Sequence, residues 1–387
     1  MTISRRALIQ HTLGVGGLIV LNGFSSQRSR KLIINIFGTG TLDVEQEGWE
    51  HLKAELSERG FATEIHFQDN GNDVGPVINT MMRGSALEDY QLGGLQGGAE
   101  RELAEDGLIV PWNLSLIPNW SSVWPQAKQI PSTRVGDKQY SLPIVLNADS
   151  IIYRPDRVGE INTYKQFFEP EDPANVRGRL AMEDSWLNSI IFSALYLKDN
   201  GIMKIYDPSN LTESELKMLM EWLIERKKAL NIKLWNGWRQ GVDFVVKGDI
   251  WLMTGWEPIA YAAQKRGINV RYAEPTEGYD GWYNGLVIHA PVAEDKRLFT
   301  ACHHVANWML GGDYACRMAA RRGYMVPVKA CPQYASRHPD DYIDLVQYNH
   351  VYNTVKKKIT QSNIYWQNVR PTLYKKYDEW WRRLRTV

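Results

Sequence analysis

A strand, a helix and a second strand follow one another near the start of the sequence, and this order limits the fold more than any other feature. Residues 31–38 form a nearly continuous apolar segment, KLIINIFG. The segment 44–59 has apolar or aromatic residues at helical spacing, and residues 61–68 return as a strand. Strand–helix–strand units form parallel sheets with right-handed crossovers. We therefore expect an α/β protein whose ligand lies at the carboxyl ends of its strands, where Thr39 stands in FGTGT.

Length and composition limit the class of protein further. The chain has 387 residues, which is enough for two domains of ordinary size. Hydrophobic residues at 44% and charged residues at 23% are typical of a soluble globular protein. The formal charge of +1 argues against a nucleic-acid partner, which usually requires an excess of basic residues. Fifteen Trp and nineteen Tyr outnumber nine Phe, so rings with a polar group predominate, as they do in wet clefts.

The first thirty residues have the pattern of an export signal. Arg5 and Arg6 precede an apolar run that is diluted by glycines and too short to span a membrane stably. The arginine pair is typical of twin-arginine signals, and an ordinary N-terminal helix is the alternative. No Cys follows the apolar run, which excludes a lipoprotein anchor. We expect residues 1–30 to be an export signal and the mature protein to be periplasmic.

Catalytic and metal-binding patterns are missing from the sequence. Three Cys exclude a disulfide framework and leave room for one bridge. The CHH run at 302–304 is not completed by further ligands at zinc-site spacing. No G-x-S-x-G motif occurs, and no His stands in a recognisable catalytic pattern. We therefore expect a binding protein without a metal or a cofactor, rather than an enzyme.

Two tryptophans stand beside glycines in segments with the pattern of a strand edge and its turn. Trp256 lies in TGWEP at 254–258, and Trp282 lies in GYDGWYNGL at 278–286. Because the glycines add no side-chain bulk, each indole can form a wall of a cleft, with a cationic or flat apolar part of a ligand against it. The alternative is that both rings pack in the core, which is common for large aromatic residues.

Four segments, in this order along the chain, resemble the polyamine (spermidine/putrescine) substrate-binding proteins of ABC transporters. YQLGGLQGGAERELAEDGLIVPWN at 90–113 is similar to a strand–helix segment of that family, and RGRLAMEDSW at 177–186 to its second-lobe strand. The similarity continues in KGDIWLMTGWEPIAYAAQKRGINVRYAEPTEGYDGWYNGLVI at 247–288 and in RRGYMVPV at 321–328. It extends over roughly residues 31–330.

The resemblance implies an α/β fold of two lobes, the clamshell of type II periplasmic binding proteins, with crossover strands at the hinge. The crossover strands are expected near 142–147 and 270–278. The family works with the permease subunits of an ABC transporter, and we expect a monomer. The expected lobes are residues 31–142 with 283–330 for lobe 1, and 143–282 with 331–387 for lobe 2.

The resemblance also implies where the ligand lies. In the family, a ligand amine is held between aromatic rings and is contacted by carboxylates. Trp256 and Trp282 correspond to aromatic walls of that cleft, and Tyr324 corresponds to a Tyr in the segment GYMVP. Asp184 corresponds to an acidic position at the end of the second-lobe strand.

Some family positions carry different residues in this chain. Asn284 stands where the family has an acidic residue, and Gln96 stands in a first-lobe turn where the family has Ser. Glu257 and Asp280, beside the two tryptophans, either restore negative charge to the cleft or lie at a solvated rim. The sequence therefore predicts a periplasmic solute-binding protein for a small organic amine or a polyamine-like ligand. The alternatives are a sugar or a zwitterion on the same scaffold, and an α/β enzyme.

Overall fold

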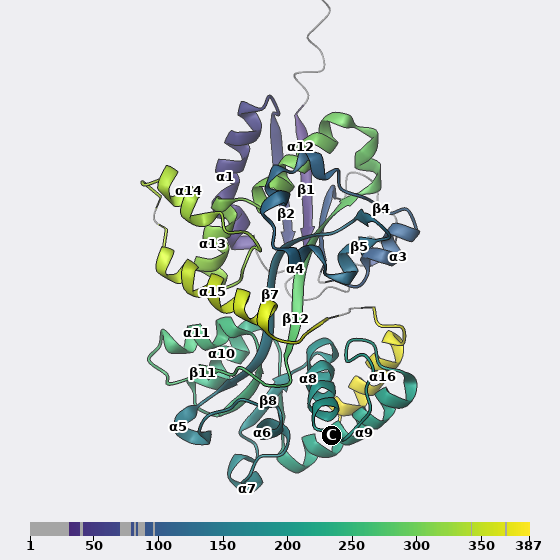
Figure 1. The fold of residues 1–387 in the computed structure, drawn as a ribbon, viewed down its shortest axis with the longest axis vertical. Helices are drawn as coiled ribbons and strands as arrows, with labels where there is room; N and C mark the ends of the chain where they lie inside the picture. Colours follow the sequence, from purple (N-terminus) through teal and green to yellow (C-terminus); the bar gives the residue numbers. More distant parts are fainter. Residues whose placement is uncertain are drawn as a thin grey trace, which may run out of the picture.

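The computed structural model of the protein has two lobes joined by long strands (Figure 1). It describes residues 31–38, 42–69, 79–80, 83, 90–95, 97–341, 343–367 and 370–387. The expected export signal at residues 1–30 lies outside the described residues and stays a prediction.

Lobe 1, the upper part of Figure 1, contains the predicted strand–helix–strand unit. Strand β1 (Leu32–Gly38) pairs in parallel with β2 (Thr63–Asp69) and with β3 (Leu92–Leu95), and helix α1 (Leu42–Glu58) connects β1 to β2. Ile34, Leu52 and Leu56 of this unit are buried in the core of the lobe. Helices α12 (Lys296–Met309) and α13 (Gly312–Arg322) pack against α1. The expected parallel sheet is confirmed.

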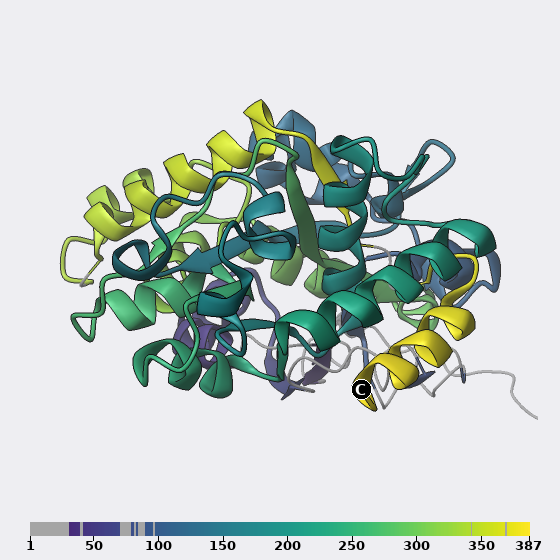
Figure 2. The same cartoon turned by 90° about the horizontal axis from the view of Figure 1, so that it is seen from below.

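Lobe 2 has a separate hydrophobic core and its own strands. Strand β8 (Leu180–Glu183) pairs in parallel with β10 (Leu252–Gly255) and with β9 (Lys233–Trp235). Helix α9 begins at the predicted capping box of Thr212 and Glu215 and lies beside α16 on the underside of the molecule (Figure 2). The longer helices of this lobe are α8 (Trp186–Asp199), α9 (Glu213–Leu230), α10 (Trp238–Val246), α11 (Glu257–Gln264) and α16 (Tyr374–Arg385).

Two long antiparallel strands, β7 (Leu142–Tyr153) and β12 (Tyr279–His289), run from one lobe into the other and are buried along their whole length. Their pairing joins the strands of both lobes in the order β2-β1-β3-β12-β7-β10-β8-β9. Strand β7 begins at the expected crossing near 142–147. The second crossing is β12 rather than 270–278, because that segment forms only the short strand β11 (Arg271–Tyr272), which pairs with β7 inside lobe 2.

A third connection runs beside the two long strands. Strand β13 (Ile364–Trp366) pairs in parallel with β12 and links helix α15 (Leu345–Gln361) of lobe 1 to helix α16 of lobe 2. Figure 1 shows this connection crossing the middle of the molecule. The hinge of the structure therefore has three chain segments, which restricts the lobes to a small set of relative movements.

The boundary expected for the C-terminal part of lobe 2 is wrong for residues 331–361. Helix α14 (Cys331–Arg337) and helix α15 pack on the core of lobe 1, to which α15 contributes Tyr348, Val351 and Val355. The cause is the apolar face of α15, which lies against α13. Helix α16 packs on the core of lobe 2 through Tyr377 and Trp381.

One disulfide bond joins Cys316 of α13 to Cys331 at the start of α14. Cys302 is a buried free thiol. The sequence left room for one bridge, and this pair forms it. Structural disulfides persist in oxidising compartments and are rare in the cytosol, so the bond fits a protein that works outside the cytoplasm.

Shorter elements complete the two lobes. The short strands are β4 (Ile109–Val110), β5 (Arg134–Val135) and β6 (Lys138–Gln139). The short helices are α3 (Glu100–Glu105), α4 (Pro125–Lys128), α5 (Pro155–Val158), α6 (Lys165–Phe168) and α7 (Pro173–Val176), with 3₁₀ turns at Leu114–Leu116, Pro118–Ser122, Pro131–Thr133 and Ala290–Glu294.

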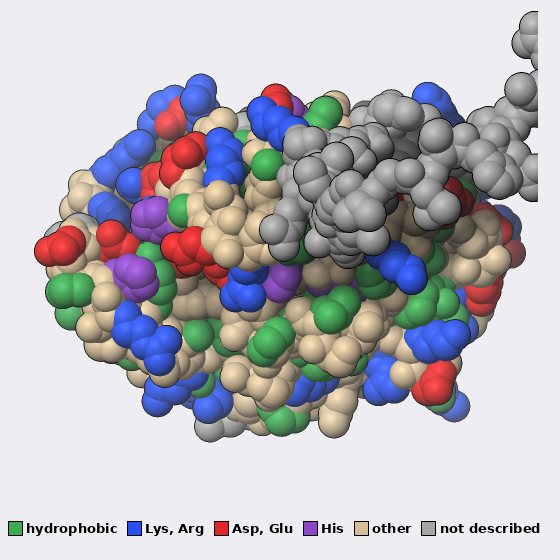
Figure 3. Space-filling model, turned by 90° about the horizontal axis from the view of Figure 1, so that it is seen from above, with side chains coloured by type: hydrophobic (Ala, Val, Ile, Leu, Met, Phe, Trp, Pro, Cys, Tyr) green, Lys and Arg blue, Asp and Glu red, His purple; other side chains and the backbone are tan. Residues whose placement is uncertain are grey.

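The surface agrees with the near-neutral charge of the sequence. On the face seen from the lobe 1 end, Asp and Glu side chains lie among the Lys and Arg side chains (Figure 3). Nucleic-acid-binding surfaces instead gather basic residues on one face. Within the described ranges, none of the helices has the length and apolar character needed to cross a membrane.

Candidate ligand-binding site

Three carboxyl groups lie buried at the junction of the two lobes. Asp149 belongs to β7 and Asp280 to β12, and the two residues are register partners in the paired crossing strands. Glu183 is the last residue of β8, at the carboxyl end of that strand. Asp149 and Asp280 are 0% exposed and Glu183 is 9% exposed. We call these three residues the carboxyl cluster.

The pKa values of the cluster are raised. Burial, opposed by the charge of Lys358, raises the pKa of Asp149 to about 7. Burial, followed by the charge of Asp149, raises the pKa of Glu183 to about 8. The same two causes raise the pKa of Asp280 well above its usual range. The three groups are therefore close enough to repel one another, and the cluster lacks enough positive charge to ionise them all at neutral pH.

Few hydrogen bonds compensate the burial of the cluster. The Trp256 indole N–H donates to Glu183 over 3.1 Å, and the Gln367 amide donates to Asp280 over 2.8 Å. Among the described residues, one oxygen of Asp149 and one of Asp280 have no hydrogen-bond partner. Buried polar atoms are nearly always paired, so such atoms indicate a place where a ligand or ordered water supplies the partner.

Both tryptophans and Tyr324 border the cluster. The half-buried Trp256 ring packs edge-on against Trp235, with ring centres 5.1 Å apart. The Trp282 ring packs edge-on against Tyr324 at 4.7 Å. The Trp282 N–H has no hydrogen bond of good geometry with any described residue, yet it helps to lower the pKa of Asp149 and therefore lies beside that carboxyl. The aromatic walls and the carboxyl groups thus occupy one region.

The glycines beside the tryptophans have a different role from the expected one. A Cβ atom on Gly255 would lie 2.8 Å from the Trp235 ring, and one on Gly281 would overlap Ile364. Gly97, with a φ of 94°, meets the Tyr283 ring in the same way. These glycines therefore make room for side chains of the protein itself, and the expectation that they clear space for a ligand is wrong at these positions.

Two of the other predicted site residues, Asn284 and Glu257, are buried near the tryptophans, and two lie outside the described residues. Asn284 is buried on β12, two residues after Trp282, and so shares its side of the strand. Glu257 is buried at the start of α11 and forms an ion pair of 2.6 Å with Lys358. Thr39 and Gln96 lie outside the described residues, and their role stays a prediction.

Asp184 does not join the cluster. Its carboxylate accepts hydrogen bonds from the Trp381 indole at 2.9 Å and from the Arg385 guanidinium at 2.6 Å, both on helix α16. Successive residues at the end of β8 point in opposite directions, so the side chain of Glu183 reaches the cluster and that of Asp184 does not. The structure therefore places Asp184 at a contact within lobe 2.

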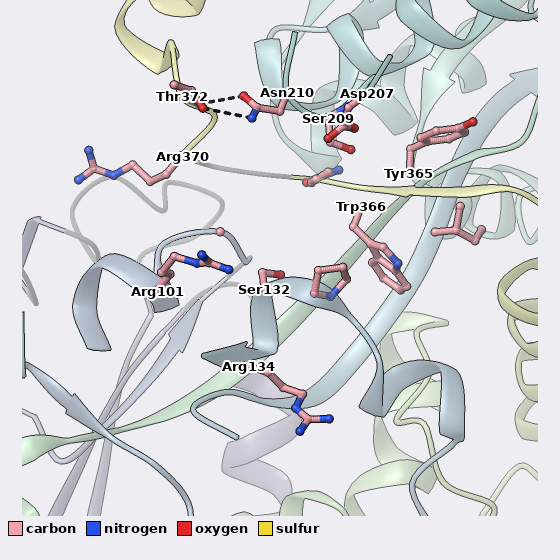
Figure 4. Close-up of a pocket in the computed structure, with 14 residues that line it drawn as sticks. Arg101, Ser132, Arg134, Asp207, Ser209, Asn210, Tyr365, Trp366, Arg370 and Thr372 are labelled. Atoms are coloured by element: carbon pink, nitrogen blue, oxygen red, sulfur yellow. Dashed lines mark hydrogen bonds between the residues drawn. The ribbon is translucent and has the colours of Figure 1, made fainter. Parts of the chain in front are cut away.

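A cavity of about 580 Å³ lies next to the cluster, between Ser132 of lobe 1 and Asn210 of lobe 2 (Figure 4). Gln367, the residue that donates to Asp280, also lines this cavity. In Figure 4 the Arg101 side chain is directed toward Ser132, whereas the guanidinium groups of Arg134 and Arg370 are directed away. The arginines therefore do not converge on one position. No group of His, Cys, Asp and Glu suited to a metal ion was found in the described ranges.

The sequence profile of one family matches most of the chain. The profile of bacterial extracellular solute-binding proteins matches residues 54–300. The chain belongs to this family. The match covers both lobes and all three residues of the carboxyl cluster. The family is more general than the polyamine-binding proteins that the sequence resembles.

Solved structures of solute-binding proteins share the fold of this one. The spermidine/putrescine ABC transporter substrate-binding protein PotD from Streptococcus pneumoniae is 15% identical, with a TM-score of 0.67 over 92% of this chain and 99% of that chain. The Tp0655 (TpPotD) lipoprotein of Treponema pallidum is 14% identical, with a TM-score of 0.68 over 92% and 100%. The binding protein MotA from A. tumefaciens, in complex with glucopine, is 12% identical, with a TM-score of 0.64 over 92% and 100%. The expected two-lobed clamshell of type II periplasmic binding proteins is confirmed.

Sequence reasoning missed three residues of this solute-binding protein: Asp149, Glu183 and Lys358. Asp149 follows Asn147 at a spacing of two in a mostly apolar crossing strand, which is a signal of a polar strip on one side of β7. Glu183 stands next to the predicted Asp184, and only the direction of the strand end distinguishes them. Lys358 lies in a helix that the expected boundaries assigned to the other lobe.

Proposed function

We propose that this solute-binding protein captures a small organic cation, an amine or a polyamine-like compound, between its two lobes and delivers it to the permease of an ABC transporter. The observation that carries the proposal is the carboxyl cluster, three buried carboxyl groups at the lobe junction with too little positive charge nearby to ionise them all. An ammonium group supplies that charge, because an opposite charge within a few ångströms favours the ionised carboxylate.

The aromatic residues support the same class of ligand. A cation over the face of Trp or Tyr gains ~0.5–2 kcal/mol, depending on how far it is removed from water. Trp256 and Trp282 both lie beside carboxyl groups, so one ammonium group can contact a ring and a carboxylate together. Similar structures include PotD of Streptococcus pneumoniae, whose name states a spermidine/putrescine transporter, and this likeness supports an amine ligand.

A zwitterion is the second candidate, because Arg101 is directed toward Ser132 in the cavity next to the cluster (Figure 4). A zwitterionic ligand would place its ammonium group at the carboxyl cluster and its acidic group near Arg101, so that each charge meets an opposite charge of the protein. The MotA structure, which holds glucopine, shows that a protein of this fold takes a ligand other than a polyamine. In either case we propose a monomer whose lobes close on the ligand by hinge movement.

A thermal-shift screen tests the proposal. The panel contains mono-, di- and triamines, amino-acid derivatives and sugars, because a ligand at about 100 times its dissociation constant adds roughly 2.7 kcal/mol to the free energy of unfolding. We expect amines to raise the melting temperature of the wild type and of Asp184→Asn, a control that removes a neighbouring carboxylate outside the cluster. Stabilisation by sugars alone, or by no amine at millimolar concentration, would contradict an organic cation as ligand.

We also propose that the twin-arginine pair exports the protein to the periplasm. The double variant Arg5→Lys, Arg6→Lys should remain in the cytoplasm, because the twin-arginine export machinery recognises the arginine pair itself. Cell fractionation with immunoblotting measures the distribution. Normal accumulation of the variant in the periplasm would show that export does not depend on these arginines.

A further inference from the structure

Lys358 places an ammonium group inside the protein, next to the carboxyl cluster. Its side chain and that of Glu257 are each 4% exposed, and their Nζ and Oε2 atoms are 2.6 Å apart. Lys358 belongs to α15 of lobe 1, and Glu257 to α11 of lobe 2. The ion pair therefore connects the two lobes at the hinge.

Each of the three N–H groups of the Lys358 ammonium group has an acceptor within the protein. Besides Glu257, it donates to the Ala148 carbonyl at 3.2 Å and to the Asn147 amide oxygen at 3.4 Å. It also lies over the rings of Tyr272, at 4.5 Å, and Tyr279, at 5.8 Å. A lysine has three donors, so this position is filled by protein contacts alone. Carbonyl, carboxylate and aromatic groups of this kind are the groups that also recognise an ammonium group of a ligand.

The charge of Lys358 reaches the cluster. It lowers the pKa of Asp149, whereas the charge of Glu257 raises it, so both members of the ion pair act on the same carboxyl group. Around this junction there are thus four carboxyl groups, Glu257 and the three of the cluster, and Lys358 contacts Glu257 and acts on Asp149 through its charge. The protein itself supplies one of the positive charges that these carboxyl groups require.

We propose that Lys358 is a specificity-determining residue, a built-in ammonium group that lowers by one the number of cationic centres the ligand needs. The proposal rests on the proposed function, because it assumes an organic cation in the cleft. Lys358 forms an ion pair with Glu257, so this carboxylate is not available to the ligand, and the charge of Lys358 repels an additional ammonium group. The protein should therefore bind the more highly charged of two otherwise similar amines less favourably than it would without Lys358. At a distance of several ångströms and an effective dielectric constant near 20, one such charge changes affinity by about tenfold or more.

The test compares two amines of equal carbon chain, 1-aminobutane and 1,4-diaminobutane, by titration calorimetry. In Lys358→Gln the amide still donates to Glu257, and the cavity of about 180 Å³ that borders both residues gives room for water. We expect the preference for the diamine, expressed as the ratio of the two dissociation constants, to rise by about tenfold or more over the wild type. The vacated carboxylate then pairs with the second ammonium group of the diamine.

The double variant Glu257→Gln, Lys358→Met removes the pair without changing its net charge and leaves neither partner buried alone. The ratio of its two dissociation constants should stay within about threefold of the wild-type ratio, since the loss of the repelling Lys358 charge is offset by the loss of the attracting Glu257 charge. An unchanged ratio in Lys358→Gln, or a tenfold shift in the double variant, would overturn the role of Lys358 while leaving the proposed function intact. If Lys358→Gln does not fold, Glu257→Gln takes its place: the Lys358 ammonium group is then no longer neutralised and should lower the preference for the diamine by about tenfold or more, and an unchanged ratio would overturn the role of Lys358. Failure of both amines to bind the wild type would overturn the proposed function, and this inference with it.

Discussion

Between pH 5 and pH 8 the unliganded protein should lose on the order of 5 kcal/mol of its free energy of unfolding because of the carboxyl cluster. The folded-state pKa values of Asp149, about 7, and Glu183, about 8, lie well above the ordinary values of 3.8 and 4.5. In this pH range the folded protein therefore holds protons that the unfolded chain has released. Stability that depends on these protons is present near pH 5 and is lost as the pH rises through the folded-state values.

The matched comparison is the triple variant Asp149→Asn, Glu183→Gln, Asp280→Asn, which mimics the protonated cluster at every pH. Denaturant unfolding of both proteins at pH 5, 6, 7 and 8 gives the free energies. Other groups with shifted pKa values, such as the buried Glu100, are present in both proteins and cancel in the difference. The difference in free energy of unfolding between the wild type and the triple variant should be small at pH 5. Toward pH 8 the triple variant should become increasingly more stable than the wild type. Parallel pH profiles would mean that the cluster is ionised in the folded protein without cost.

The second large effect concerns binding. The same triple variant should bind an amine about a hundredfold or more weakly than the wild type, because each hydrogen bond to a charged group contributes roughly 1.5–3 kcal/mol. In the wild type, affinity for the amine should rise with pH up to about 8, the pKa of Glu183, since the ligand replaces protons on the cluster. Asp184→Asn removes a carboxylate held by Trp381 and Arg385, so it should bind like the wild type.

A contrary result is easy to recognise in this comparison. Equal affinity of the triple variant and the wild type would place the ligand elsewhere at the lobe junction, for instance in the cavity near Arg101. A loss of affinity in Asp184→Asn as large as that in the triple variant would mean that Asp184 belongs to the site after all.

Much of the fold could be predicted from local patterns. The parallel unit of β1, α1 and β2 follows from an apolar strand, a helical spacing and a second strand close together in sequence. The capping box of Thr212 and Glu215 is also local, and the structure confirms it. The position of α15 was not predictable in this way, because it depends on packing against α13, a contact between helices that a local pattern does not reveal.

The site was predictable only in part, for the same reason. Trp256, Trp282 and Tyr324 were chosen from glycine-rich segments and from the resemblance to a family, and they lie beside the cluster. Their contact with a ligand stays a prediction. Asp280 was considered because it stands beside Trp282, but Asp149 and Glu183 were missed. The three carboxyl groups come from three strands distant in sequence, and strand direction decides which acidic residue faces the junction. The glycines misled the prediction, since Trp235 and Ile364, which fill the space beside them, are far away along the chain.

The most direct test of the central claim, that a ligand cation replaces protons on the carboxyl cluster, is titration calorimetry of an amine at pH 7 in two buffers with different enthalpies of ionisation. If the claim holds, the observed binding enthalpy differs between phosphate and MOPS, neither of which is a primary amine, by an amount that corresponds to the release of about one proton, because the cation lowers pKa values that lie near 7 and 8 in the free protein. The triple variant should show no such difference. Identical enthalpies in both buffers for tight binding to the wild type would contradict the claim.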